Sequence, residues 1–202
     1  MQEYRTLEDG TSEHKTLENE MIEYCSPTLA GLKTANMFSH KYTRMEQLLN
    51  EIEDKNCKLN RKGVYIDILR SSQSRVLIYV YRKEMLSEEL RVWEIREFLR
   101  QYDYRSCEQG ECLTHLKKRM RESGGFPHEV GIFLGYPLSD VVGFIENEGK
   151  NYKCCGIWKV YSNEQRTLEL FEKYKKCTDR FSEMYAEGKP LIELTKVVSF
   201  IN

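Results

Sequence analysis

The chain has 202 residues, of which 40% are hydrophobic and 31% are charged, and its formal net charge is −1 at pH 7. This length and composition are typical of one soluble globular domain with a buried core. The near-neutral charge argues against a nucleic-acid partner, which needs a basic surface, and no apolar run approaches the ~20 residues that a membrane span needs.

The start of the chain is polar and acidic. We expect residues 1–12 to be flexible and residues 13–202 to form the domain. Neither a signal peptide nor a transit peptide is indicated, so we place the protein in the cytoplasm. Irregular spacing of the seven cysteines favours reduced thiols over a disulfide framework. The cysteines are Cys25, Cys57, Cys107, Cys112, Cys154, Cys155 and Cys177.

Before residue 60 the sequence predicts two helices with an extended segment between them. Apolar residues recur at helical spacing over 13–24 and again over 42–54. Pro27 and Gly31 argue against a helix in the intervening stretch. We therefore expect a buried extended segment there.

Two runs of β-branched and aromatic residues follow, at 63–70 and 75–82. They are joined by the short connector "SSQS" and predict an antiparallel hairpin. The second run is apolar on both faces, so we expect it inside a sheet that is covered on both sides. Asp67 in the first run then needs a partner or a position at an edge.

The second half alternates helices and short strands. Ser87 is a candidate N-cap for a helix that ends near residue 102, and Gly188 is a candidate C-cap for a long helix over 163–187. The other expected elements are helices over 110–122, 137–149 and 191–202, and strands over 129–135 and 154–161. This order describes one layered α/β (α+β) domain, in which a mixed, mostly antiparallel sheet is flanked by helices.

The stretch "FPHEVGIFLGYPLSDVVGFIENEG", residues 126–149, concentrates candidate site residues. Gly135 allows close backbone approach at a strand-to-helix turn, where α/β folds place ligands, and the free amides of the helix start favour an anion. His128 is a candidate general base or ligand contact, oriented by Glu129 or Asp140. The alternative is that the glycine only makes a tight corner and that His128 is inert.

The cysteines offer two further candidate sites. Cys25 follows a helix and precedes a proline, so we expect it to be the most exposed and reactive thiol. With His128 and Asp140 it is a candidate cysteine-hydrolase set. Cys107 and Cys112 are candidate zinc ligands together with the nearby His115, but their C-x4-C spacing is loose and we assign no metal.

Two further short motifs are an aromatic strand and a basic run. In "GIWKVY", residues 156–161, alternation puts Trp158 on one face and Lys159 with Tyr161 on the other. This is typical of a core strand, but with Tyr136 it also predicts aromatic walls and one cation for a flat anionic ligand. The basic run "KKRMR" at 117–121 indicates a solvated helix face rather than a phosphate site.

Three stretches, "CSPTLAGLKTANMF", "FPHEVGIFLGYPLSDVVGFI" and "CCGIWKVYS", resemble in this order a family of uncharacterised proteins of anaerobic, mainly clostridial, bacteria, the domain of unknown function DUF3793. The resemblance covers nearly the whole chain after the first dozen residues and implies no known activity. Ile157 departs mildly from the family's aromatic residue at that place. The residues that match the three motifs are Cys25, Pro27, Thr28, Gly31 and Lys33; His128, Glu129, Gly131, Gly135, Tyr136, Pro137, Asp140 and Gly143; and Gly156, Trp158, Lys159 and Tyr161.

We expect the three motifs to form a site for a small anionic or flat ligand, where the loop 128–140 lies near the strand 154–161. The residues expected to bind it are Lys33, His128, Gly135, Tyr136, Trp158, Lys159 and Tyr161, and the candidates for catalysis are His128, Glu129, Cys25 and Asp140. Whether the protein is an enzyme, and which cofactor it uses, stays open. The alternatives are a protein-interaction module with a protein partner and the cysteine hydrolase; neither nucleic acid nor membrane is expected as a partner.

Overall fold

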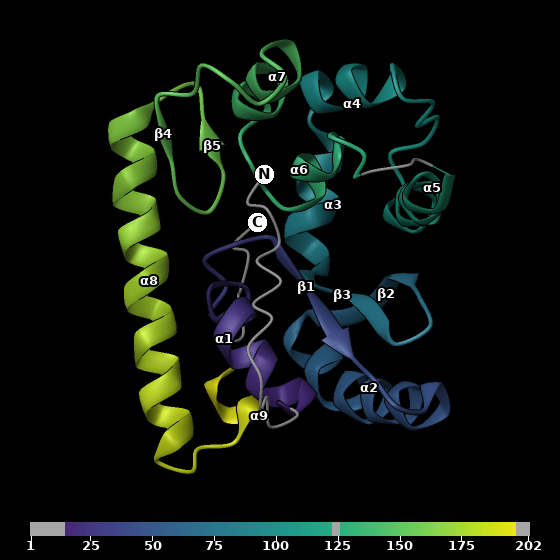
Figure 1. The fold of residues 1–202 in the computed structure, drawn as a ribbon, viewed down its shortest axis with the longest axis vertical. Helices are drawn as coiled ribbons and strands as arrows, with labels where there is room; N and C mark the ends of the chain where they lie inside the picture. Colours follow the sequence, from purple (N-terminus) through teal and green to yellow (C-terminus); the bar gives the residue numbers. More distant parts are fainter. Residues whose placement is uncertain (1–14, 123–125, 197–202) are drawn as a thin grey trace.

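The computed structural model describes residues 15–122 and 126–196, and the expected flexible segment 1–12 lies outside them. Its centre is a three-stranded antiparallel sheet with the order β1-β3-β2 (Figure 1). The strands are β1 (Ala35–Lys41), β2 (Val64–Ser71) and β3 (Arg75–Arg82). The predicted hairpin and the central place of its second strand are thus confirmed. All pairings among the described residues are antiparallel.

Helices cover both faces of this sheet, which confirms the predicted layered α+β domain. Side chains of β3 alternate, so Tyr79 joins one hydrophobic cluster and its neighbour Ile78 joins the other. The Tyr79 face is covered by α3 (Lys83–Arg91), α4 (Trp93–Arg100), α5 (Gln109–Glu122), α6 (Val130–Phe133) and α7 (Leu138–Glu146). The Ile78 face is covered by α1 (Leu17–Leu29), α2 (Met45–Leu59), α8 (Glu164–Ala186) and α9 (Leu191–Leu194).

The α1 helix corrects the prediction of an extended segment after Cys25. It continues through Pro27 to Leu29, and Gly31 beyond its end has a left-handed φ of 77°. The Leu32 amide donates to the Pro27 carbonyl at 2.8 Å, which closes the helix end. Residues 25–29 are all buried. Tertiary packing therefore outweighs the one backbone hydrogen bond that the proline removes, and the chain becomes extended only at β1.

Four expected elements have other bounds or another state. The helix expected over 191–202 is only α9 within the described residues, with Thr195 extended, and residues 197–202 lie outside them. The helix expected from Ser87 starts directly after β3, so Ser87 lies inside α3, and a break at Val92 separates α4. The expected strand at 129–135 is the one-turn helix α6, because a short buried apolar run has no periodicity that separates the two states. The expected strand at 154–161 is a hairpin of β4 (Cys154–Cys155) and β5 (Lys159–Val160).

The other expected helices, α2, α5, α7 and α8, are present. Asp67 has the partner that its place in β2 required, because Lys117 Nζ lies 2.6 Å from its carboxylate. No helix in the described parts of the chain is long and apolar enough to cross a bilayer. The 3-10 turn η1 (Asn60–Lys62) links α2 to β2.

Candidate functional site

The first two sequence motifs meet at the corner where α1 leads into β1 and α6 leads into α7. Lys33 is buried there, and its Nζ donates to the Leu134 carbonyl at 2.9 Å and also to the carbonyl of Ala35. The same Nζ lies 5.2 Å from the centre of the Tyr136 ring. The predicted convergence of Lys33 and Tyr136 is therefore observed, but the amine is occupied by protein carbonyls.

A partly buried acid, Glu89, interacts electrostatically with this buried base. Burial lowers the pKa of Lys33 to about 7, against the opposing effects of Cys25 and Glu89. Burial also raises the pKa of Glu89 to about 7, although Thr34 Oγ1 donates to its carboxylate at 2.5 Å. Both groups therefore change their charge near neutral pH. Glu89 carries no sequence motif, and sequence reasoning missed it.

Gly135 has a steric role at the corner. Its φ is 72°, and a Cβ there would lie 2.7 Å from Thr34 Oγ1 and 2.8 Å from Thr34 Cβ. Residues other than glycine adopt this conformation at a cost in free energy, and glycine leaves room for the chain that leads into β1. The close neighbour that Gly135 accommodates is Thr34, the residue before β1.

The aromatic residues of the second and third motifs also meet, but they pack on one another. The Tyr136 and Trp158 rings stack with centroids 4.6 Å apart, and Phe171 from α8 meets the Trp158 ring edge-on at 4.6 Å. Trp158 is only 4% exposed. Its faces therefore stabilise the junction between α7, the β4–β5 hairpin and α8.

Asp140 is the polar centre of that junction. Its Oδ2 accepts a hydrogen bond from Trp158 Nε1 at 2.8 Å. Its Oδ1 accepts from the amides of Tyr161 and Ser162 at 2.9 and 2.8 Å and from the Ser162 hydroxyl at 2.7 Å. With four donors on a carboxylate that is 2% exposed, Asp140 holds the hairpin onto α7.

The remaining motif residues have separate environments. His128 is exposed, and its ring meets Phe144 with centroids 5.2 Å apart. Lys159 Nζ donates to the Gly149 carbonyl at 2.8 Å and lies 5.0 Å from the centre of the Tyr152 ring. Tyr161 packs against Gly143, where an added Cβ would meet its ring at 2.6 Å. The structure does not gather these three side chains into one site with Lys33.

The structure corrects the expectation that Cys25 is the most exposed and reactive thiol. Cys25 is fully buried in the cluster on the Ile78 face, and burial raises the pKa of its thiol well above the ordinary value. His128 precedes α6, which packs on the opposite face of the sheet. Asp140 is already saturated by its donors. The hydrolase set is thus not assembled here.

Glu129 belongs to a different polar cluster, beside α5. It is completely buried, forms an ion pair with Arg119, and accepts a hydrogen bond from the Tyr104 hydroxyl at 3.4 Å. Arg119 also lies over the Tyr102 ring, 5.3 Å from its centre. Glu129 therefore anchors α6 to α5 and to the segment that precedes it.

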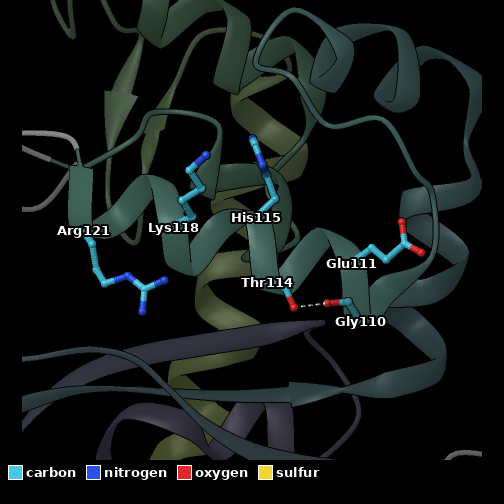
Figure 2. Close-up of a pocket in the computed structure, with 6 residues that line it drawn as sticks. All are labelled: Gly110, Glu111, Thr114, His115, Lys118 and Arg121. Carbon is cyan, nitrogen blue, oxygen red and sulfur yellow. Dashed lines mark hydrogen bonds between the residues drawn. The ribbon is translucent and has the colours of Figure 1, made fainter.

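Two adjoining cavities of about 460 and 450 Å3 open along α5 and share Glu111, His115 and Lys118. We call them together the α5 groove. Figure 2 shows the side chains of its first part, which project from successive turns of α5. The residues that line the groove are Asp103, Tyr104, Arg105, Ser106, Gly110, Glu111, Cys112, Thr114, His115, Lys118, Arg119, Arg121 and Glu122.

The tautomer of His115 follows from its contacts. Its Nε2 lies 2.9 Å from the Tyr102 carbonyl oxygen, and since a carbonyl only accepts, Nε2 carries a proton. The ring also meets Tyr104 edge-on, with centroids 4.4 Å apart. These two contacts fix the position of the ring. The sequence signal for this groove was the basic run at 117–121. Helical periodicity alone indicated only that this run lies on a solvated helix face.

The seven cysteines are free, and among the described residues no three His, Cys, Asp or Glu side chains gather to hold a metal ion. No curated protein and no solved structure matches the chain. A family model, described as a protein of unknown function (DUF3793), matches residues 21–195. This range includes all three motifs, and the chain therefore belongs to the DUF3793 family.

Proposed function

We propose that the protein binds a small anionic ligand, a carboxylate or phosphate compound, in the α5 groove. The observation that supports this most is that Arg105, Lys118 and Arg121 line cavities of about 450 to 460 Å3. Ligand sites are typically about 300 to 1,000 Å3. Arginine and lysine are the side chains that bind carboxylate and phosphate most strongly.

The charges of the groove are available to a ligand. Within the described ranges, neither Arg105 nor Arg121 makes an ion pair, and Lys118 lies 3.9 Å from Glu122 in a pair that is mostly exposed. Such exposed pairs contribute about 0–1 kcal/mol and are easily exchanged. The acidic Asp103 and Glu111 also line the groove. This mixed lining favours a compact anion over an extended polyanion.

The proposed ligand belongs to the class that the sequence predicted, but its site is the α5 groove instead of the loop 128–140. Lys33, Tyr136 and Trp158 converge as expected, but their contacts are to protein carbonyls and to each other. His115 takes the role expected of His128, because its ring is fixed beside the basic residues of the groove. Enzymatic activity and a cofactor stay unassigned, and the cytoplasmic location and bacterial source stay predictions from the sequence.

A protein partner is the second candidate, and one observation favours it. Trp93 is 67% exposed and its neighbour Val92 is 44% exposed, at the break between α3 and α4. Exposed tryptophan is a common centre of protein interfaces. If the full chain associates with itself in sedimentation velocity and the Trp93→Ala variant does not, this second function is supported.

The test of the first proposal is titration calorimetry at low salt with inorganic phosphate, citrate and ATP. We expect at least one of them to bind, and Lys118→Ala and Arg121→Ala to weaken it about tenfold or more, as the loss of a charge-assisted contact predicts. Lys175→Ala is the matched control, because Lys175 is exposed on α8. The proposal is overturned if none of the three anions binds at millimolar concentration, or if the groove variants bind as tightly as the control.

A further inference from the structure

Two thiols lie at the start of α5, and the groove described above passes over one of them. The Cys112 amide donates to the Glu108 carbonyl at 3.0 Å, which makes Glu108 the residue that caps the helix. Cys107 therefore stands just before the cap, and Cys112 is the fourth residue of the helix. Side chains at these two positions commonly pack against each other at helix starts.

The hydrogen bonds of this turn bring the thiols together. Cys112 Sγ donates to the Ser106 carbonyl at 3.1 Å. Since a carbonyl oxygen lies about 2.8 Å from the next Cα of a trans peptide, the Cys112 sulfur is at most about 6 Å from the Cys107 Cα. The Glu108 amide also donates to Ser106 Oγ at 3.0 Å, which fixes the backbone on both sides of Cys107.

The two thiols differ in their surroundings. Cys112 is buried, whereas Cys107 is partly exposed. Burial, with smaller contributions from Cys107 and the carboxylates of Glu111 and Glu108, raises the pKa of Cys112 to about 11. Cys107 is thus the thiol that a small reagent reaches first, and Cys112 stands behind it.

We propose that Cys107 and Cys112 are a thiol–disulfide exchange site that forms an intramolecular disulfide with a low-molecular-weight disulfide as oxidant. The Cys107 thiolate attacks one sulfur of the oxidant, forms a mixed disulfide and releases one thiolate. Cys112 then loses its proton to water and attacks the Cys107 sulfur, which releases the second thiolate. Two protein thiols are oxidised by two electrons, and the oxidant is reduced to two thiols.

The bond would alter the wall of the α5 groove, because Ser106 and Cys112 both line it. This consequence rests on the proposed function, whereas the disulfide rests on the geometry of the turn alone. The two are separable, since the disulfide is detected by mass without any ligand.

The test uses oxidised glutathione on the native full chain, followed by alkylation of free thiols, digestion with trypsin and mass spectrometry. Both cysteines fall in the tryptic peptide 106–117, so the disulfide appears as a loss of about 2 Da and resistance to alkylation. Two other sites serve as references for the oxidation of peptide 106–117. The peptide 154–159 contains two adjacent cysteines, and Cys57 is an exposed single thiol. We expect peptide 106–117 to close before Cys57 is half modified.

Two variants complete the test. Cys112→Ser should trap a glutathione adduct on Cys107, and Cys107→Ser should leave Cys112 largely unmodified. The proposal is overturned if, once Cys57 is glutathionylated, peptide 106–117 is still fully alkylated or carries stable adducts in the unmodified sequence.

Discussion

Asp140 gives the sharpest test of how the family motifs stabilise the fold. The change is Asp140→Ala, which removes an acceptor that receives four hydrogen bonds from Trp158, Tyr161 and Ser162. The donors stay behind, and an unpaired buried donor costs about 1–3 kcal/mol. Because Tyr161 and Ser162 are only partly buried, water replaces part of the loss. We therefore expect destabilisation by about 3–5 kcal/mol.

The isosteric change Asp140→Asn separates charge from shape. The asparagine oxygen still accepts at one position, but its amide nitrogen faces a donor and the negative charge is lost. Hydrogen bonds to a charged group contribute about 1.5–3 kcal/mol, so we expect an intermediate loss of about 2 kcal/mol. If the alanine variant does not fold, this variant carries the test.

The assay is urea unfolding followed by circular dichroism, with the free energy taken from the midpoint and slope. The matched control is Asp54→Ala, because Asp54 is exposed on α2; we expect a change within about 0.5 kcal/mol. A loss below about 1 kcal/mol for Asp140→Ala, or equal losses for both positions, would show that the carboxylate does not hold the hairpin to α7.

Three further predictions concern the corner and the buried thiol. Lys33 binds fewer protons in the folded than in the unfolded chain between its folded pKa of about 7 and its ordinary pKa of 10.5, so stability rises with pH in that range. Glu89 binds more protons in the folded chain between its ordinary pKa of 4.5 and its folded pKa of about 7, so stability falls with pH in that range. Urea midpoints at pH 5, 7 and 9 should show that Lys33→Met flattens the upper slope and Glu89→Gln the lower one, and unchanged slopes would contradict the assignment. Gly135→Ala should destabilise by about 1–3 kcal/mol, because its Cβ meets Thr34 at 2.7 Å at positive φ, whereas Gly110→Ala, with open space around it, should be neutral or stabilising by up to about 1 kcal/mol in the same unfolding assay. Iodoacetamide on the native protein should label exposed Cys57 and leave buried Cys25 unlabelled; peptide mass spectrometry that finds both labelled at similar rates would refute this burial.

The hairpin and the long helices could be predicted because their signals are local. Alternation on both faces of 75–82 requires a covered strand, and β3 is the central strand with a cluster on each side. The apolar spacing of 163–187 likewise requires one packed helix face, and α8 has it. Tyr136 also lies beside both Lys33 and Trp158, as expected from the proposal that their three motifs meet.

The sequence by itself therefore determined the fold class, the sheet hairpin and most helix positions, because periodicity and propensity act over a few neighbouring residues. The tertiary structure alone decided the state of short segments and the role of each polar residue. Burial around residues 25–29 carries α1 through Pro27, and packing turns 130–133 into a helix. Whether the Asp140 carboxylate receives Trp158 and whether Lys33 meets the Leu134 carbonyl depends on elements distant in sequence. Such contacts leave no local pattern, because they are set by how the layers pack.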